Sequence, residues 1–209
     1  TESLKEKYGR SQNVYLIFNG VESPAKIEST EYIKSLGLTK NKYIFALGRF
    51  VEEKGFHNLI NAYANCNANI GFDLVLAGDA DHETEYSRFL KQLATDNNVV
   101  LTGFVTGNKL AELFSHAGLF VLPSFHEGLP IALLEALSYD LDCIVSNIPA
   151  NTQVALPPED FFDPENVDEL SEKIDEKLSV PVRRRRYNLA QYNWNTIAMQ
   201  TFTVYKKML

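Results

Sequence analysis

The stretch LFVLPSFHEGLPIALLEALSYDLDCIVS, residues 119–146, decides the fold class. It begins with one apolar run, LFVLP at 119–123, and ends with another, CIVS at 143–146. Between them lies PIALLEALSYD, 130–140, whose apolar residues have the spacing of a helix. Two strands joined through a helix form a βαβ unit, in which the strands run parallel to each other.

The same alternation continues on both sides of this unit. Further strands are expected at NVYLIF (13–18), KYIFAL (42–47), FDLVLA (72–77) and NVVLTGF (98–104). Further helices are expected within 57–66, 83–96, 108–118, 167–179 and 193–209. Near-continuous apolar strands are typical of a sheet that is covered on both faces. The sequence therefore predicts an α/β fold, a Rossmann-like parallel sheet with helices on both faces.

The first forty residues differ in pattern from the rest. VYLIFNG followed by VESPAK, 14–26, indicates a strand, a glycine turn and an extended segment that contains proline. We interpret residues 1–40 as a lead-in and residues 41–209 as the α/β domain, which ends in a helix. The alternative is that 13–18 forms the first strand of the same sheet.

Composition excludes several classes of protein. The 209 residues include 20 Lys and Arg against 27 Asp and Glu, a net charge of −7 that disfavours general binding to nucleic acid. No apolar run reaches the roughly 18–20 residues that span a bilayer, so no transmembrane helix is expected, and the polar first residues are not the pattern expected of a signal peptide. Two cysteines are too few for a disulfide framework and fit a reducing cytoplasm. The basic run Arg183–Arg186 is either solvated or faces an anionic membrane surface.

The loop after 42–47 carries two cations, Arg49 and Lys54. Ligands of open parallel sheets bind beyond the carboxyl ends of the strands, where a forked and a point-like cation suit a diphosphate. The chain has neither a GxxxxGK[ST] sequence nor a GxGxxG sequence after a strand, so these are not the usual phosphate loops. The alternative is that both are surface cations paired with Glu52 or Glu53.

The loop after 119–123 offers a stronger candidate. Pro130 is expected in the first turn of the following helix, which leaves free amide groups that can bind an anion. Glu127 precedes this helix and Glu135 lies inside it among apolar residues, where a lone carboxylate is costly unless it has a partner. Their spacing is roughly 12 Å or less. A nucleotide sugar fits, with its sugar at Glu127 and its ribose at Glu135, and His126 could touch the same ligand.

Taken in order, several segments resemble the C-terminal half of the retaining glycosyltransferases of family four, the glycosyl transferases group 1. These segments are GRFVEEKG (48–55), LVLAGD (74–79), NVVLTGFV (98–105) and PSFHEGLPIALLEALSYDLDCIVSNIP (123–149). The spacing from Glu127 to Glu135 matches the E-x7-E motif of that family. The resemblance implies one half of a GT-B fold, in which two Rossmann-like domains face a cleft. It also implies that 1–40 leads out of an absent N-terminal domain.

The resemblance also implies roles for individual residues. Glu127 would be the catalytic residue and would contact sugar hydroxyls. The implied donor-binding residues are Arg49, Lys54, Phe104, Val105, Gly128, Leu129 and Glu135. Of these, Arg49 and Lys54 would hold the diphosphate, Glu135 the ribose hydroxyls, and Phe104 with Val105 would lie near the base. Related enzymes use no metal ion, and neither a metal nor a cofactor is expected here.

The function implied is transfer of a sugar from an NDP-sugar to a glycan or lipid-linked acceptor, as in polysaccharide biosynthesis. The acceptor would bind through the absent N-terminal domain, so the isolated domain is expected to be inactive. The expected location is the cytoplasm, or the inner face of the membrane with peripheral association. The segment SNIPAN (146–151) and Asp140, which stands where a glycine is frequent, depart from the family pattern. Two alternatives are a GT-B nucleotide-sugar epimerase and a non-catalytic nucleotide-binding module.

Overall fold

The computed structural model describes residues 7, 9 and 14–208, which form two compact units. The sheet unit is Ser23–Tyr187, and the terminal unit combines the chain up to Glu22 with the chain from Asn188 onward. These boundaries, before Ser23 and after Tyr187, differ from the expected boundary between residues 40 and 41. That division remains a prediction about the domains of a longer chain.

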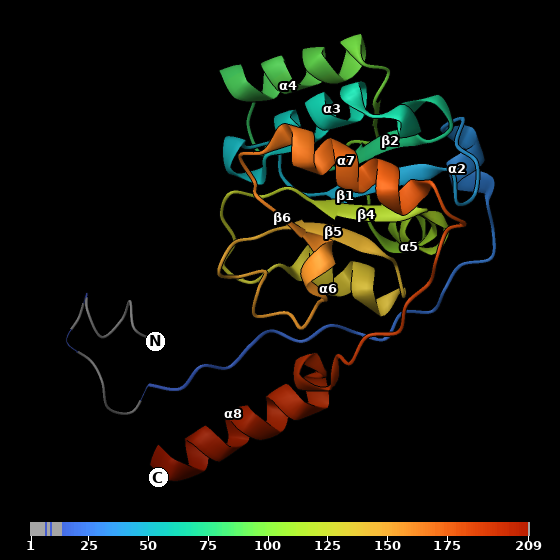
Figure 1. The fold of residues 1–209 in the computed structure, drawn as a ribbon. Coiled ribbons are helices and arrows are strands. Elements are labelled where there is room, and N and C mark those ends of the chain that lie inside the picture. The colour runs from blue at the N-terminus through green and yellow to red at the C-terminus, as the bar shows by residue number, and fades with distance from the viewer. Residues whose placement is uncertain (1–6, 8, 10–13, 209) are drawn as a thin grey trace. The chain divides into compact units, whose positions relative to one another are not determined.

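The described part of the sheet unit contains one parallel sheet of six strands in the order β3-β2-β1-β4-β5-β6 (Figure 1). The strands are β1 (Tyr43–Leu47), β2 (Asp73–Ala77), β3 (Val100–Leu101), β4 (Leu119–Leu122), β5 (Cys143–Ser146) and β6 (Phe161–Phe162). In this register Phe45 of β1 lies opposite Val75 of β2 and Phe120 of β4. The order is that of a doubly wound Rossmann sheet, so the predicted fold class is confirmed.

Helices cover both faces of this sheet (Figure 1). They are α2 (Glu31–Ser35), α3 (Phe56–Asn65), α4 (Glu85–Asp96), α5 (Gly107–His116), α6 (Ile131–Ser138) and α7 (Val167–Leu178). Helices α3, α4 and α7 lie together on one face, and α5 and α6 cover the other. Local sequence sets their starts: Thr84 and Ser87 form a capping box before α4, and the Asn166 side chain accepts from the Glu169 amide in α7.

The core follows the alternation of side chains along the strands. Ile44 and Ala46 of β1 point into the layer formed with α3, α4 and α7. Phe45, between them, points to the opposite layer, where its ring centroid lies 5.0 Å from that of Phe114 in α5 and 6.1 Å from that of Phe120. Both layers are apolar, which explains why the strands appear in the sequence as continuous apolar runs.

The sheet differs from the sequence-based expectation at both ends. Residues 14–18 of the run NVYLIF form no strand, so that prediction is wrong, and Asn13 lies outside the described residues. Leu16 in this run is 61% exposed, so its apolar character does not reflect burial in a core. The sixth strand is instead β6, which was not predicted because two residues carry no periodic pattern.

The terminal unit is built around α8 (Trp194–Met208), which follows the short helix Ala190–Tyr192. The Val21 amide donates to the Tyr192 carbonyl oxygen at 2.7 Å. Gly20 is needed beside it, because a Cβ there would lie 2.5 Å from the Trp194 ring. Phe202 and Tyr205 of α8 are exposed, so this helix presents apolar side chains to solvent.

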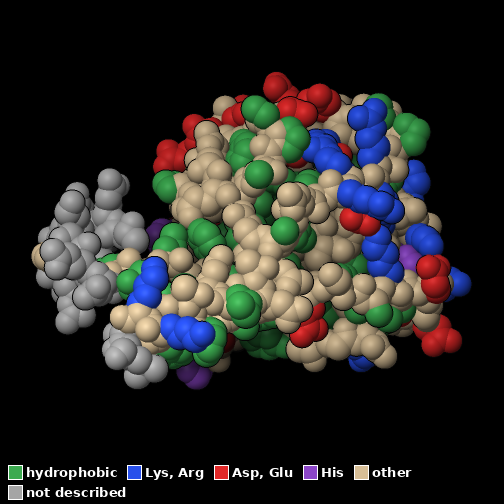
Figure 2. Space-filling view, turned by 90° about the horizontal axis from the view of Figure 1, so that it is seen from below, with side chains coloured by type: hydrophobic (Ala, Val, Ile, Leu, Met, Phe, Trp, Pro, Cys, Tyr) green, Lys and Arg blue, Asp and Glu red, His purple; other side chains and the backbone are tan. Residues whose placement is uncertain are grey.

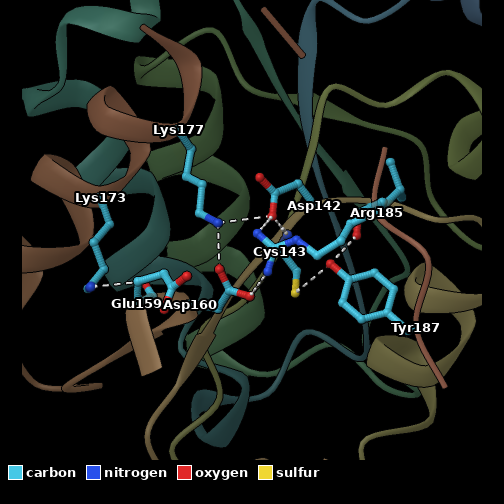
Figure 3. A network of polar contacts seen from close by, with 9 residues as sticks. Asp142, Cys143, Glu159, Asp160, Lys173, Lys177, Arg185 and Tyr187 are labelled. Atoms are coloured by element: carbon cyan, nitrogen blue, oxygen red, sulfur yellow. Dashed lines mark hydrogen bonds and ion pairs between the residues drawn. The ribbon is translucent and has the colours of Figure 1, made fainter. Parts of the chain in front are cut away.

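The basic run Arg183–Arg186 is partly engaged inside the sheet unit. Arg184 donates to the carbonyl oxygens of Ser115 and Ala117 at 3.0 and 2.8 Å. Arg185 joins the network in Figure 3, in which the buried carboxylates of Asp142 and Asp160 contact both its guanidinium and the Lys177 ammonium. Two of the four arginines therefore act as internal anchors.

Figure 3 also shows that Arg185 and Tyr187, which follow α7 in the chain, lie against Asp142, Cys143 and Asp160. Burial alone would lower the pKa of Lys177, but its bonds to Asp160 and Asp142 outweigh that effect and raise the pKa. The Tyr187 hydroxyl donates to the Leu141 carbonyl oxygen at 3.0 Å. Each buried charge thus has partners of opposite sign, as the cost of burying a charge requires.

Asp140, at the end of α6, contacts both chain segments that join the sheet unit to the rest of the protein. Its φ of 60° is left-handed, as expected for an aspartate in place of a glycine. Its carboxylate accepts from the Lys26 ammonium at 2.6 Å. Its carbonyl oxygen accepts from the Arg185 amide at 2.9 Å.

The surface gives little support to a uniform basic patch. On the face seen in Figure 2, Lys and Arg side chains lie in separate groups, and carboxylates lie among those toward the right-hand side. Among the described residues, no helix is long and apolar enough to cross a membrane. Peripheral association with a membrane stays a prediction.

Candidate functional site

The candidate site lies where the two central strands, β1 and β4, end side by side. From this pair the strand order runs outward in opposite directions, which makes it the switch point where open α/β sheets bind ligands. The loops 48–55 and 123–130 follow these strands. They are tied together by a hydrogen bond from the Phe125 amide to the Glu53 carbonyl oxygen, 2.8 Å long.

The predicted residues Lys54 and Glu127 meet across this switch point. The Lys54 ammonium lies 2.7 Å from Oε1 of Glu127, and the two side chains are only 17% and 8% exposed. The Ser124 hydroxyl donates to the same oxygen at 2.7 Å. The pair is shielded from solvent, so its electrostatic attraction exceeds that of an ordinary surface ion pair.

Gly55 allows the first loop to approach the second this closely. Its φ of 64° lies in the left-handed region, which other residues adopt only at a cost. A Cβ at Gly55 would also collide with the carbonyl oxygen of Pro123, directly after β4. Only glycine fits both conditions, and Lys54, one residue earlier, is thereby brought against the loop of Glu127.

The start of α6 provides unpaired amide groups beside Glu127. Pro130 is the N-cap and the helix begins at Ile131, so the expectation of Pro130 inside the first turn is corrected by one residue. The Ile131 amide donates to the Leu129 carbonyl oxygen at 2.8 Å. The amides of Gly128, Leu129 and Ala132 donate no hydrogen bond within the part of the chain that the structure describes. They are the groups with which a helix N-terminus binds an anion.

Glu135 lies about one turn along α6 and is half-buried between the buried residues Leu134 and Ala136. Among residues 7, 9 and 14–208 its carboxylate has no hydrogen-bond or ion-pair partner. Burial raises its pKa above the ordinary value of 4.5. Glu127 lies in the loop before the helix. Within the helix, Glu135 is four positions after Ile131, which is about 6 Å along the axis.

Arg49 lies at the end of β1 but has partners other than those of Lys54. Its guanidinium is 3.2 Å from the Asp81 carboxylate and 3.8 Å from that of Glu53, and its side chain is 54% exposed. Pairing with Glu53 is the alternative that the sequence left open for Arg49. Lys54 pairs with Glu127, which is not the Glu52 or Glu53 of that alternative.

The remaining predicted residues are more exposed. The Gly78 amide donates to the Gly103 carbonyl oxygen at 2.9 Å, which fixes the loop of Phe104 and Val105 beside the end of β2. Phe104 is 65% exposed. His126 is exposed and has no hydrogen-bond partner among the described residues. The structure thus joins Lys54 and Glu127 directly, whereas Phe104 and His126 are exposed and Val105 is half-buried.

Three buried polar residues behind the site were not predicted. Ser124, Ser146 and Asn151 are all fully buried. The Asn151 amide group donates to the Ser146 carbonyl and hydroxyl oxygens at 2.9 and 3.0 Å, and the Ser146 hydroxyl donates to the Ser124 carbonyl oxygen at 2.5 Å. The signal in the sequence is weak, because Ser and Asn side chains usually face solvent.

No group of three or more His, Cys, Asp or Glu in the described residues is arranged to hold a metal ion. The expectation of a site without a metal or cofactor is not tested by this observation and stays a prediction. Cys66 and Cys143 are free and buried. Burial raises the pKa of the Cys143 thiol to about 12, which disfavours the thiolate form.

The family model for glycosyl transferases group 1 matches residues 28–194. The chain belongs to this family. A galactosyltransferase of Escherichia coli, UDP-Gal:alpha-D-GlcNAc-diphosphoundecaprenol alpha-1,3-galactosyltransferase, is 30% identical over 71% of the chain and 40% of its own length. An uncharacterized glycosyltransferase of Methanocaldococcus jannaschii is 27% identical over 99% of the chain and 58% of its own length. The chain thus spans about half the length of the curated relatives it matches.

Solved structures agree with this assignment to glycosyl transferases group 1 at the level of the fold. Anabaena HepE, determined in complex with UDP-glucose, has a TM-score of 0.82 at 18% identity. The match covers 99% of the present chain and 60% of the HepE chain. Sucrose-phosphate synthase from Thermosynechococcus elongatus has a TM-score of 0.80 at 23% identity. That match covers 99% of the present chain and 56% of the synthase chain. The sheet is that of GT-B glycosyltransferases, and the chain is consistent with their C-terminal domain.

Proposed function

We propose that this chain is the donor-binding part of a retaining glycosyltransferase and that it binds a nucleoside diphosphate sugar. The observation that carries the proposal is the shielded Lys54–Glu127 pair at the switch point, directly before the N-terminus of α6. A cation beside unpaired amides suits a diphosphate, and an adjacent carboxylate suits the hydroxyls of a sugar. Glu135, which is half-buried and has no partner among the described residues, provides an acceptor for the ribose hydroxyls.

The proposed arrangement places charge where the reaction needs it. The bond between the anomeric carbon and the phosphate oxygen breaks, and the leaving diphosphate becomes more negative. Lys54 and the amides of Gly128 and Leu129 stabilise that charge, as preorganised donors do in other enzymes. The acceptor oxygen attacks from the same face and its proton passes to the departing phosphate oxygen, which retains the configuration. Arg49 binds the diphosphate if it exchanges its exposed contacts with Asp81 and Glu53 for the ligand.

A thermal-shift panel tests donor binding. The ligands are UDP-glucose, GDP-mannose, ADP-glucose and dTDP-glucose, and one of them at 100 times its Kd adds about 2.7 kcal/mol of stability. For a chain of this size that raises the Tm by about 5–10 °C. Lys54→Met is expected to lose the shift, and Lys173→Met in α7 is the matched control. No shift with any of the four sugars would refute the proposal.

The product distinguishes transfer from the alternatives. We propose that the acceptor is a glycan or is lipid-linked, and that transfer takes place in the cytoplasm. We also propose that a further domain binds the acceptor, because a single sheet with its loops provides no second surface that would orient it. Positioning of two reactants supplies about 7–11 kcal/mol of catalysis. The 209-residue chain is therefore expected to bind its donor and to transfer no radiolabelled sugar to a membrane extract. Transfer by this chain alone would contradict that expectation, and an epimerised nucleotide sugar would favour an isomerase.

A further inference from the structure

The two carboxylate oxygens of Glu127 have different surroundings. Oε1 accepts from both the Lys54 ammonium and the Ser124 hydroxyl, each at 2.7 Å. Oε2 accepts from no described residue, and it is not among the buried atoms that lack a partner. The carboxylate is therefore held through one oxygen, and its other oxygen is accessible to a ligand.

The direction of each hydrogen bond behind Glu127 follows from the groups involved. A carboxylate only accepts, so the single hydroxyl proton of Ser124 points to Oε1. Asn151 donates to the Ser146 hydroxyl oxygen at 3.0 Å, and the Ser146 proton points to the Ser124 carbonyl oxygen. Ser124 is thus fixed at its backbone by β5 and fixes Glu127 with its side chain.

Lys54 alone cannot keep Glu127 in place while a donor is bound. A lysine ammonium is a point charge on a flexible stem, and a diphosphate would compete with Glu127 for its protons. The Ser124 hydroxyl is neutral and fully buried, so it remains on Oε1 when the charge of Lys54 is shared.

We infer that Ser124 is a positioning residue, which holds Glu127 by Oε1 so that Oε2 accepts from the hydroxyls of the donor sugar. Ser146 and Asn151 support it from behind. The identity of the group on Oε2 rests on the proposed function, whereas the hold on Oε1 is a property of the free chain. Loss of the Ser124 hydroxyl should therefore affect the sugar more than the nucleotide.

Calorimetric titration of the 209-residue chain with two pairs of probes tests this inference. The pairs are UDP with UDP-glucose, and GDP with GDP-mannose. Ser124→Ala should lower affinity for the nucleotide sugar about tenfold, the effect of a hydrogen bond to a charged group, and change affinity for the plain diphosphate less than about twofold. Ser124→Thr, which keeps a hydroxyl, should restore most of the difference. Ser171→Ala, a buried serine in α7, is the control.

Equal losses for the diphosphate and the nucleotide sugar would overturn the inference, as would unchanged affinity for both. A second measurement needs no ligand. In thermal unfolding of Ser124→Ala, Glu127→Ala and the double variant, the double variant should lose less Tm than the sum of the single variants, because both changes remove the same bond. Additive losses overturn the inference. If the wild type binds no probe, the proposed function fails, and this cycle still decides whether Ser124 holds Glu127.

Discussion

Replacing Glu135 by glutamine should separate stability from binding. The carboxylate is half-buried in α6 without a partner among the described residues, and burial raises its pKa. In the free protein its charge is therefore unfavourable, and Glu135→Gln removes that charge while keeping the shape of the side chain. We expect a Tm at pH 7 that is equal to or above that of the wild type.

Binding should change in the opposite direction. In the proposed complex, two ribose hydroxyls donate to Glu135, and each bond to a charged acceptor contributes about 1.5–3 kcal/mol. Glutamine keeps one neutral oxygen as an acceptor, so about half of that total should be lost. The expected affinity for the nucleotide is about 10–100-fold lower, since each 1.4 kcal/mol is tenfold. Calorimetric titration at pH 7.5 measures it.

The pH dependence gives a second readout of Glu135. Its pKa is raised in the folded state above the ordinary value of 4.5, so the folded chain binds more protons between these two values. Its contribution to stability is present below pH 4.5 and is lost as pH rises through the folded pKa. The Tm advantage of Glu135→Gln over the wild type should therefore grow from pH 4 to pH 7.

The control for this variant is Glu172→Gln, which changes an exposed glutamate in α7. It should alter neither the Tm nor the affinity. Equal nucleotide affinity of wild type and Glu135→Gln would refute the ribose role of Glu135. A Tm that falls by several degrees at pH 7 would show that the carboxylate has a stabilising partner in solution.

Three further changes follow from contacts described above. The double variant Arg49→Met with Lys54→Met should bind a nucleoside diphosphate at least 100-fold more weakly in calorimetric titration, because both cations are proposed to contact the diphosphate. Its affinity for the unphosphorylated nucleoside should stay almost unchanged. Equal losses of affinity for both ligands would instead indicate damage to the loop. Gly55→Ala should lower the Tm by at least about 2–4 °C, because the left-handed backbone conformation costs an alanine about 1–2 kcal/mol. The added Cβ would also collide with the Pro123 carbonyl oxygen. An unchanged Tm would contradict this prediction. Asp160→Ala should lower the free energy of unfolding, measured with urea, by about 3–5 kcal/mol, because Lys177 and Arg185 each lose a buried partner. A loss under about 1 kcal/mol would contradict the stabilising role of this network.

Most of the sheet could be predicted because its strands are buried on both faces. Leu119–Leu122 and Cys143–Ser146 are buried throughout, so their sequences are apolar at every position except the last, Ser146. The run at 14–18 has the same composition but packs in the terminal unit, with Leu16 exposed. An apolar sequence does not reveal whether other parts of the protein bury its side chains. The buried strands of the sheet and the partly exposed run at 14–18 could therefore not be distinguished from the sequence. Strand β6 has only two residues, too few for any pattern.

The candidate site was predictable where chain position alone fixes geometry. Lys54 and Glu127 follow the ends of adjacent strands, so the topology brings them together. The partners of Arg49 depend on the paths of surface loops, which the sequence does not specify. Ser146 and Asn151 were missed because their roles depend on burial and on a contact with a loop 22 residues away in the chain.

The contacts of Asp140 have a consequence for engineering. Its carboxylate holds Lys26 and its carbonyl oxygen holds Arg185, three and two residues from the ends of the Ser23–Tyr187 unit. The two ends therefore leave the sheet unit at the same corner. Domains with neighbouring ends tolerate circular permutation. A short glycine-serine linker could join Tyr187 to Ser23, and new ends could be opened at the exposed turn around Gly71, away from the loops that carry Lys54 and Glu127.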